Sequence, residues 1–201
     1  MIAEAPRKEP FAPQALPLVA VVTPVYNGEK YLAATMACVQ RQTYQNLVHI
    51  ILDNASADES PAILARFADA AVPVRVHRNS QTLPQQANWN AAMRLVPEDA
   101  AFVQWLCADD LIRADAIEKL VAKAQSDPAI TCVGGADVVH DRVLHTRLID
   151  GQTIEDGLSF IRRVARWEDA HFAWQAFFIR WRSEWAQSDF FKPGAPSFDC
   201  E

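Results

Sequence analysis

Glycine is scarce in this sequence, and the glycine-rich loops that cradle phosphate groups in many nucleotide-binding proteins are missing. Glycine accounts for 6 of the 201 residues, and no GxGxxG, GKS/T or GxSxG pattern occurs. These absences exclude the dinucleotide-binding fingerprint, the P-loop and the nucleophile elbow of serine hydrolases. If the protein binds phosphate, another group must neutralise the charge, and a divalent cation held by carboxylates is the best candidate.

Paired cysteines, long apolar runs and an excess of positive charge are also missing. The four cysteines are widely separated, which argues against a zinc knuckle or a thioredoxin-like motif and favours a reduced, cytoplasmic protein. The longest apolar run has five residues, Leu18 to Val22, so we expect no membrane-spanning helix, and no secretory signal is visible. The formal net charge of -6 favours neither nucleic acid nor an anionic membrane as a partner.

What is present suits one globular domain. Hydrophobic residues make up 50% of the chain and charged residues 22%, as in an ordinary soluble protein with a sizeable core. Residues 1–17 differ from the rest, because they carry four of the twelve prolines and show no apolar periodicity. This composition predicts a flexible N-terminal arm.

From residue 18 onward, short apolar runs alternate with segments of helical periodicity. We expect strands at residues 18–23, 47–52, 74–77, 101–106 and 130–133. We expect helices at residues 28–42, 60–70, 83–95 and 113–126, and after residue 135 only a helix near 157–166 and a strand near 175–179. This alternation predicts an α/β fold with a mostly parallel, Rossmann-like sheet flanked by helices. In such sheets ligands bind outside the carboxyl ends of the strands.

Local signals mark the expected ends of these elements. Pro24 should end the first strand, and Asn27 should cap the helix that follows. Ser60 and Pro61 have the residue types of an N-cap and a first helical position.

Two adjacent carboxylates, Asp109 and Asp110, come shortly after the expected strand 101–106. They should lie at the carboxyl end of a central strand, where a doubly wound fold places its site. Mg²⁺ and Mn²⁺ prefer oxygen ligands, so the pair could hold a cation that bridges a diphosphate. Either aspartate could instead cap the next helix, and the residues alone leave both interpretations open.

Asp53 ends the second expected strand and belongs to the same edge of the sheet. Its carboxylate could accept a hydrogen bond from an imide N–H such as that of uracil. The alternative is a turn-forming role, which is the commoner one for an isolated aspartate. We expect the nearby Asp58 to cap a helix or stabilise the loop.

Three stretches of the sequence, taken in chain order, point together to one known protein family. The first is VAVVTPVYNGEKYLAATMACVQRQTYQNLVHIILDNASADES, with a strand ending in TPVYN, a helix with a QTY end and a strand ending in an aspartate. The second is the segment Asn88-Trp89-Asn90-Ala91-Ala92. The third is FVQWLCADDLIRADAIEKLV, which resembles the family's Asp-x-Asp motif with its preceding strand and following helix. In this order the three stretches resemble the family 2 glycosyltransferases, which have the GT-A fold, and the similarity covers residues 19–133.

The resemblance implies transfer of a sugar from a nucleotide donor, often UDP-linked, to a glycan, lipid-linked or other hydroxyl acceptor. It also implies inversion at the sugar and assistance by Mg²⁺ or Mn²⁺. Asp109 matches the metal-binding position of the family. The residues that would contact the substrates on the donor side are Pro24, Val25, Tyr26, Asp53, Asn90 and Asp110.

Two positions depart from the family pattern. Cys107 stands where the family has the first aspartate of Asp-x-Asp, so metal binding through Asp109 would be weaker or would use a different nucleotide contact. The segment before the fourth strand often reads Ala-Arg-Asn in the family, but here it lacks the arginine. Cationic help from this helix is therefore in doubt.

The late region is expected to serve the acceptor. By resemblance, Asp199 would be the general base that deprotonates the acceptor hydroxyl; an N-cap or a frayed terminus is the equal alternative. Trp174 could stack on an acceptor sugar, although tryptophans at this spacing are more often part of a core. The arginines between residues 162 and 166 could touch an acidic lipid-linked acceptor, which allows a peripheral membrane contact.

The resemblance also divides the chain. Residues 18–135 would form the nucleotide-sugar-binding half, and residues 136–201 an acceptor-side region that is incomplete, because the chain stops two residues after Asp199. A non-catalytic nucleotide- or glycan-binding or scaffold relative is the main rival, favoured by Cys107. A sugar-phosphate nucleotidyltransferase is the second rival, disfavoured because it needs a glycine-rich loop after the first strand.

Overall fold

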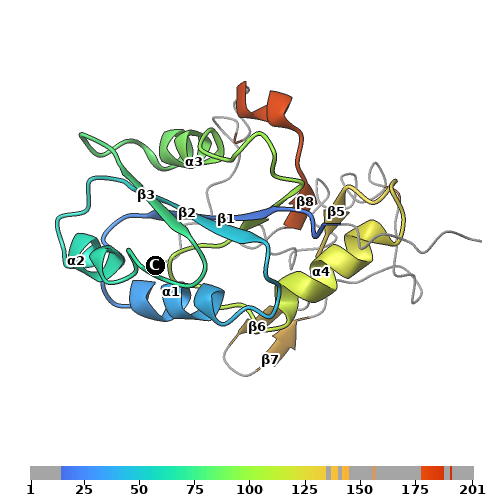
Figure 1. The fold of residues 1–201 in the computed structure, drawn as a ribbon. Coiled ribbons are helices and arrows are strands. Elements are labelled where there is room, and N and C mark those ends of the chain that lie inside the picture. Colours follow the sequence, from blue (N-terminus) through green and yellow to red (C-terminus); the bar gives the residue numbers. More distant parts are fainter. Residues whose placement is uncertain are drawn as a thin grey trace, which may run out of the picture.

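The computed structural model describes residues 15–134, 137–139, 142–144, 156, 178–187 and 191. Within this part of the chain, six strands form one sheet in the order β3-β2-β1-β4-β8-β5 (Figure 1). The strands are β1 (Val19–Val25), β2 (Leu47–Asp53), β3 (Val74–Arg78), β4 (Phe102–Trp105), β5 (Cys132–Val133) and β8 (Phe178–Arg180). The first four run parallel, whereas β8 is antiparallel to both β4 and β5. The expected α/β fold with a mostly parallel sheet is confirmed.

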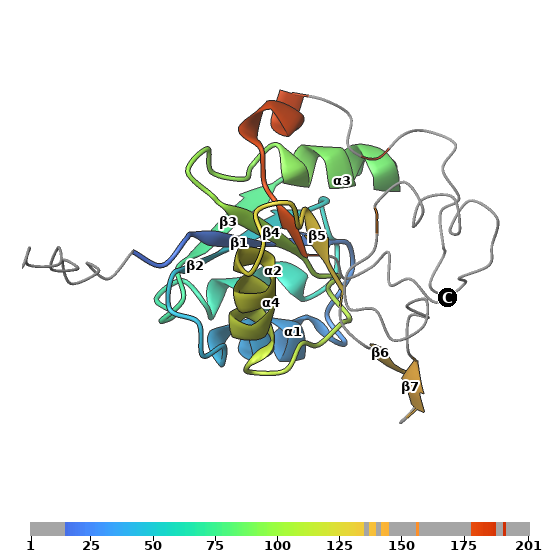
Figure 2. The same cartoon turned by 90° about the vertical axis from the view of Figure 1, so that its right-hand side faces the viewer.

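Helices cover both faces of this sheet. They are α1 (Leu32–Gln40), α2 (Ser60–Ala65), α3 (Gln85–Met93) and α4 (Ala116–Gln125). Helix α3 lies on one face, and α1, α2 and α4 lie on the other (Figure 1). The quarter turn in Figure 2 shows the same two layers. Among the described residues, no helix has the length and apolar character needed to cross a bilayer.

The core forms on both sides of β1, whose side chains alternate between the two faces. Val21 packs in one buried cluster with Ile117 of α4, and Val22 packs in another with Met93 of α3. All seven residues of β2 are buried as well. Burying a valine, leucine or isoleucine side chain contributes about 1.5–3 kcal/mol, so covering both faces stabilises these central strands strongly.

Pro24 does not end β1, contrary to expectation. The strand continues through Pro24, which pairs with Leu52, to Val25. Even-numbered residues of β1 point their backbone groups toward β4, since Leu106 N–H donates to the Val22 carbonyl (3.0 Å). At Pro24, β4 has already ended, so the missing N–H leaves no ladder bond unmade.

The late part of the chain completes the sheet. Strand β8 lies where a strand near 175–179 was expected, and it inserts between β4 and β5. The residues expected near 157–166 to form a helix lie outside the described residues. The structure also contains a short antiparallel pair that the sequence did not indicate, β6 (Asp137–Val139) with β7 (Arg142–Leu144), and a 3₁₀ helix, η2 (Ser183–Gln187).

Candidate active site

The loops after β1 and β2 meet at the carboxyl edge of the sheet and are joined by hydrogen bonds. The Asn27 N–H donates to Ser56 Oγ (2.9 Å), and the Glu29 N–H donates to the Asp58 carboxylate (2.8 Å). The expected loop-stabilising role of Asp58 is therefore confirmed. Because oxygens of one loop accept the N–H groups of the other, the turn that follows β1 is held in one position.

Asn27 and Ser60 connect these loops rather than capping helices. Helix α1 begins at Leu32, and Asn27 has a φ of 49°, so the expected N-cap at Asn27 is wrong. Its Oδ1 accepts the Ala57 N–H (2.9 Å) instead. Ser60 Oγ accepts the Gly28 N–H (2.8 Å), and α2 has no side-chain cap bond. Short polar side chains can either cap a helix or bond the backbone of another loop, so the local sequence could not distinguish these two roles.

Asp53 is buried at the end of β2, with 1% of its surface exposed. One carboxylate oxygen accepts the Ser56 N–H (3.0 Å), and the other forms an ion pair with Arg78. Arg78 also donates to the Ser56 carbonyl (2.8 Å). Between them, Ala55 has a φ of 57°, a left-handed conformation that persists in a non-glycine residue only where the surroundings fix it. The bond to Ser56 supports the turn-forming alternative, and a contact with a base stays a prediction.

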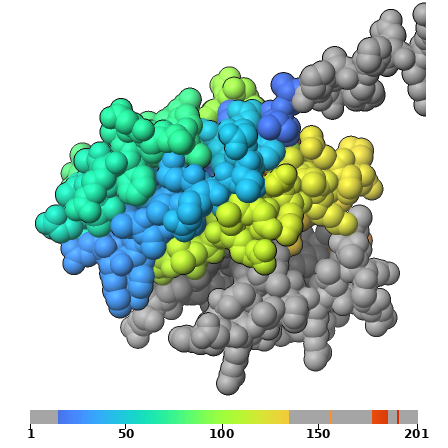
Figure 3. Space-filling model, turned by 60° about the horizontal axis from the view of Figure 1, so that its bottom comes forward, coloured from blue at the N-terminus to red at the C-terminus, as the bar shows by residue number. Residues whose placement is uncertain are grey.

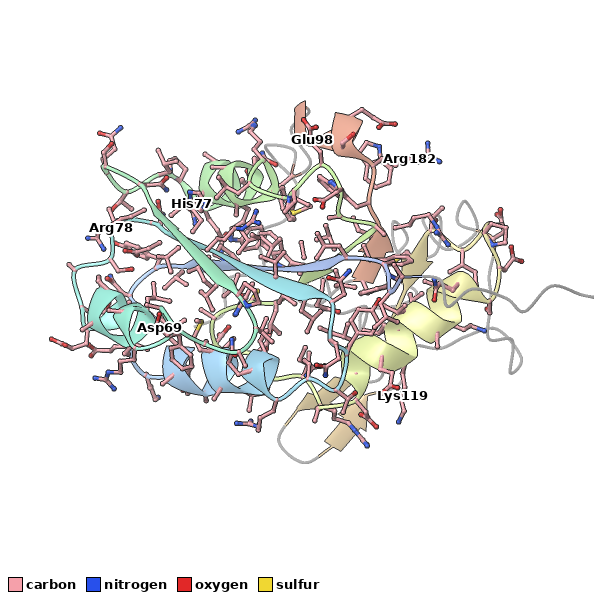
Figure 4. The ribbon with its side chains drawn as sticks, viewed as in Figure 1. Asp69, His77, Arg78, Glu98, Lys119 and Arg182 are labelled. Carbon is pink, nitrogen blue, oxygen red and sulfur yellow. The ribbon has the colours of Figure 1, made fainter. Side chains whose placement is uncertain are left out.

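Arg78 is a candidate residue that the sequence reasoning missed. It ends β3, beside α2, and 47% of its side chain remains exposed (Figure 4). A groove of about 420 Å³ lies between α2 and β3, within the range of about 300–1,000 Å³ typical of small-molecule sites. Its lining residues are Asp53, Pro61, Leu64, Ala65, Ala68, Val74, Val76 and Arg78. The ion pair thus supplies the charged groups of an otherwise apolar groove. One signal in the sequence could have identified Arg78. It is a basic residue directly after the expected strand 74–77, and that strand is the next one along the chain after the strand that precedes Asp53.

The loop after β4 gathers three potential metal ligands. One ligand atom from each of Cys107, Asp109 and Asp110 lies within 4.8 Å of the others. The Asp110 N–H donates to the Cys107 carbonyl (3.2 Å), so a tight turn brings these residues together. Helix α4 has Asp115 as its N-cap, so the alternative that Asp109 or Asp110 caps it is wrong. Two carboxylates and a thiol form a donor set that fits a divalent cation.

Helix α1 holds this turn in place. The buried Thr35 hydroxyl lies 2.8 Å from the Ala108 carbonyl and 3.0 Å from that of Asp110, and it donates to both. A Cβ on Gly28 would lie 3.7 Å from the Ala108 side chain, so the first turn and the metal-ligand turn are in close contact. In Figure 3 the blue residues of α1 lie against the yellow-green residues that follow β4. The structure therefore brings the first and fourth strand ends together.

Of the three turn residues expected to flank a nucleobase, one reaches the surface. Pro24 and Val25 are buried, whereas Tyr26 is 56% exposed. An exposed aromatic ring can stack on a base or a sugar. Tyr26 is therefore the residue of this turn that is available for a direct contact.

Asn90, expected to contact substrate, has both ends of its amide bound within the protein. Its Nδ2 donates to the Phe191 carbonyl (2.8 Å), and its Oδ1 accepts the Phe191 N–H (2.7 Å). The Phe191 ring lies 5.1 Å from that of Trp89 and 4.9 Å from that of Trp105. Asn90 thus attaches a late segment to α3, and a contact with substrate stays a prediction. Trp174 and Asp199 lie outside the described residues.

This chain is similar in sequence to curated glycosyltransferases over more than half of its length. This chain is 30% identical to the glycosyltransferase GlyG of Streptococcus pneumoniae over 118 residues. These residues cover 58% of this chain and 38% of GlyG. It is 21% identical over 137 residues to the glucosyltransferase WfgD of Escherichia coli, covering 68% of this chain and 53% of that one. The chain thus spans about half or less of the length of these curated relatives.

Solved structures share the fold. A crystal structure of S. aureus TarS, residues 1-349, matches 81% of this chain and 47% of its own with a TM-score of 0.67 and 16% identity. The mannosyltransferase PcManGT from Pyrobaculum calidifontis, solved with GDP-Man and Mn²⁺, matches 84% of this chain and 46% of its own with a TM-score of 0.59 and 21% identity. At these identities the likeness shows the GT-A fold alone.

The sequence match to a family model is broader than the sequence match to either curated relative. The model of the family described as Glycosyl transferase family 2 matches residues 20–184, a span that includes the turn after β1, Asp53 and the Cys107–Asp110 turn. The chain therefore belongs to glycosyl transferase family 2.

Proposed function

We propose that this protein transfers a sugar from a nucleoside diphosphate donor to a hydroxyl acceptor. The observation that carries the proposal is the cluster of Cys107, Asp109 and Asp110 at the carboxyl end of β4, in a chain of this family. A divalent cation held there would face a diphosphate bound at the edge of the sheet, where α/β folds bind ligands. The lack of a glycine-rich loop agrees with neutralisation by a cation.

The proposed donor is a UDP-sugar. The crystal structure of TarS in complex with UDP-GlcNAc matches this chain with a TM-score of 0.52. The name of WfgD gives UDP-Glc as its donor. PcManGT was solved with GDP-Man, so the nucleotide has to be tested directly. WfgD acts on a sugar linked to diphosphoundecaprenol, and a glycan or lipid-linked acceptor is proposed here.

Several residues have roles in the proposed donor site. Asp109 would hold Mg²⁺ or Mn²⁺ with help from Asp110, and the cation, when bound, supplies positive charge to the diphosphate leaving group. Tyr26 would stack on the base. Arg78, oriented by the buried Asp53, would present N–H donors to the base or ribose, and Asp53 could accept the imide N–H of uracil.

The acceptor side of the reaction rests on residues outside the described structure. Asp199 would remove the proton from the acceptor hydroxyl as that oxygen attacks the anomeric carbon, which inverts the configuration there. Trp174 would stack on the acceptor. The division into an arm at 1–17, a donor half at 18–135 and an acceptor region at 136–201 stays part of the proposal, although β8 of the third segment pairs with β4 of the second. A cytoplasmic location, with peripheral membrane contact, also stays a prediction.

Thermal-shift measurements with UDP, GDP and their sugars, each with and without Mn²⁺, test the donor site. A ligand at 100 times its Kd stabilises a protein by about 2.7 kcal/mol, so binding will raise Tm measurably. We expect a Mn²⁺-dependent shift with UDP that Asp109→Asn abolishes. Asp99→Asn is the matched control, because Asp99 is exposed and lies before β4, at the opposite edge of the sheet. Metal-independent UDP binding that is unchanged in Asp109→Asn would refute the metal role.

A non-catalytic nucleotide- or glycan-binding relative is the second candidate, and Cys107 at a metal-ligand position favours it. Release of free sugar from the donor in the presence of Mn²⁺ separates an enzyme from a binding protein. Asp199→Asn should abolish transfer to an acceptor while leaving the UDP-dependent thermal shift intact. Binding without turnover by the unmodified protein would support the binding role.

A further inference from the structure

We infer that Cys107 binds the donor-site cation directly through its sulfur, and that this thiolate makes the site favour softer divalent metals over Mg²⁺. The inference rests on the proposed function, whose cation it specifies. It concerns the residue that departs from the family pattern, since Cys107 stands where the first aspartate of Asp-x-Asp is expected.

The geometry brings the sulfur into the ligand cluster. Cys107 Sγ and one carboxylate oxygen from each of Asp109 and Asp110 all lie within 4.8 Å of one another. Metal–sulfur and metal–oxygen bonds to zinc measure about 2.3 and 2.0–2.2 Å, so atoms at this separation can share one ion. Cys107 is partly buried and Asp109 is exposed, which leaves the cluster open to solvent on one side. Protein ligands on one side and an open position on the other are typical of a catalytic metal site.

The turn is fixed by contacts that do not use the ligand atoms. The Asp110 N–H bonds the Cys107 carbonyl, and the Thr35 hydroxyl bonds the carbonyls of Ala108 and Asp110. The Cys107 side chain also packs at the edge of the apolar cluster around Trp105. The three ligand atoms are therefore held near one another by the backbone and by packing.

The chemistry of the donor set predicts its preference. Mg²⁺ requires hard oxygen ligands in near-ideal octahedral geometry, and a thiolate does not suit it. Co²⁺ and Zn²⁺ accept mixed sulfur and oxygen ligands, and affinity for a mixed ligand set rises from Mn²⁺ to Co²⁺. When such an ion binds, the Cys107 thiol releases its proton to solvent, because the thiolate is the ligand.

Cobalt absorption spectroscopy tests the sulfur bond without relying on activity. A thiolate–Co²⁺ bond gives a charge-transfer band in the near ultraviolet, which carboxylate ligands do not give. We expect this band when Co²⁺ is added to the unmodified protein with UDP. It should persist in Cys132→Ser, since Cys132 is exposed on β5 and does not belong to the cluster, and it should be lost in Cys107→Ser.

The metal preference is tested with Cys107→Asp, which restores two aspartates at the family spacing. In the unmodified protein, the UDP-dependent thermal shift should be saturated by Co²⁺ at a concentration at least about tenfold lower than by Mg²⁺, the scale on which neighbouring groups change metal affinity. Cys107→Asp should bring the two saturating metal concentrations closer together and so lower their ratio. An unchanged ratio would contradict the inference.

The outcomes separate this inference from the proposed function. A UDP-dependent shift with Co²⁺ but no charge-transfer band leaves the donor site standing and refutes the sulfur ligand. A band with Co²⁺ but no response to any nucleotide keeps the sulfur ligand and refutes the donor site. If neither a band nor a shift is found, both are wrong.

Discussion

Asn90 binds the backbone of Phe191 with both ends of its side-chain amide, and the two residues are 101 positions apart in the chain. The Phe191 ring packs against both Trp89 of α3 and Trp105 of β4, whose rings also contact each other. Because Trp105 is the last residue of β4, this attachment lies close in sequence to the metal-ligand turn. A late segment of the chain is thus joined to the strand that positions the candidate site.

Asn90→Ala should destabilise the protein. It removes two part-buried hydrogen bonds to the Phe191 backbone, and such bonds contribute about 0.5–1.5 kcal/mol each. Urea unfolding will measure the loss. Asn46→Ala is the control, because Asn46 makes one exposed bond, to the Leu16 carbonyl, and its removal should change stability by less than about 0.5 kcal/mol. Equal effects of the two substitutions would show that the Phe191 contact contributes little.

Thr35→Val should weaken metal binding without removing any ligand. The substitution deletes the hydroxyl that bonds the carbonyls of Ala108 and Asp110 while keeping the shape of the side chain. We expect Mn²⁺-dependent UDP affinity to fall about tenfold, as for other groups that orient metal ligands. Thr35→Ser keeps the hydroxyl and should retain nearly full affinity. Isothermal titration calorimetry measures both variants, and a loss in Thr35→Ser as large as in Thr35→Val would contradict this role.

The ion pair between Asp53 and Arg78 predicts coupled effects on nucleotide binding. If Asp53 acts by orienting Arg78, Asp53→Asn should reduce UDP affinity in the unmodified protein but not in an Arg78→Gln background. If Asp53 also contacts the base, the loss should persist in that background. Affinities of the four proteins in this double-mutant cycle decide between the two, and Asp53→Asn with unchanged affinity throughout would exclude both.

Stability should fall in mild acid because of His49. This residue is fully buried, with Nε2 bonded to Thr23 Oγ1 (2.9 Å), and burial lowers its pKa to about 3. Between the unfolded pKa near 6.5 and pH 3, the unfolded chain takes up a proton that the folded protein does not. Stability from this group is therefore present above about pH 6.5 and decreases as the pH drops, by about 2 kcal/mol at pH 5.

His49→Gln separates this effect from other acid effects. The glutamine can still bond Thr23 but does not titrate, so the difference in unfolding free energy between pH 7 and pH 5 should shrink. His77→Gln is the control, because it makes the same substitution at a histidine that is exposed on β3. Urea unfolding at the two pH values measures this difference for each of the three proteins, and the same pH dependence in His49→Gln as in the unmodified protein would refute the assignment to His49.

Much of the donor side could be predicted from residues that are neighbours in sequence. Continuous apolar runs such as that in β2 predict strands covered on both faces, and Asp109 follows such a run, so its place at the carboxyl end of β4 was predictable. Helix ends were less predictable. Asn27 and Ser60 have the residue types of caps, but their partners are about thirty positions away, and no local pattern reveals such a partner.

The sequence by itself determined the α/β class, the positions of the main strands along the chain and the resemblance to the family, because apolar periodicity and short motifs depend on nearby residues. Only the tertiary structure decided which side chains from separate segments of the chain contact one another. It paired Arg78 with Asp53, attached Phe191 to Asn90, placed the Thr35 hydroxyl on the metal-ligand turn and inserted β8 between β4 and β5. These contacts join segments far apart in the chain, and burial creates them by forcing each polar group to find a partner once water is excluded.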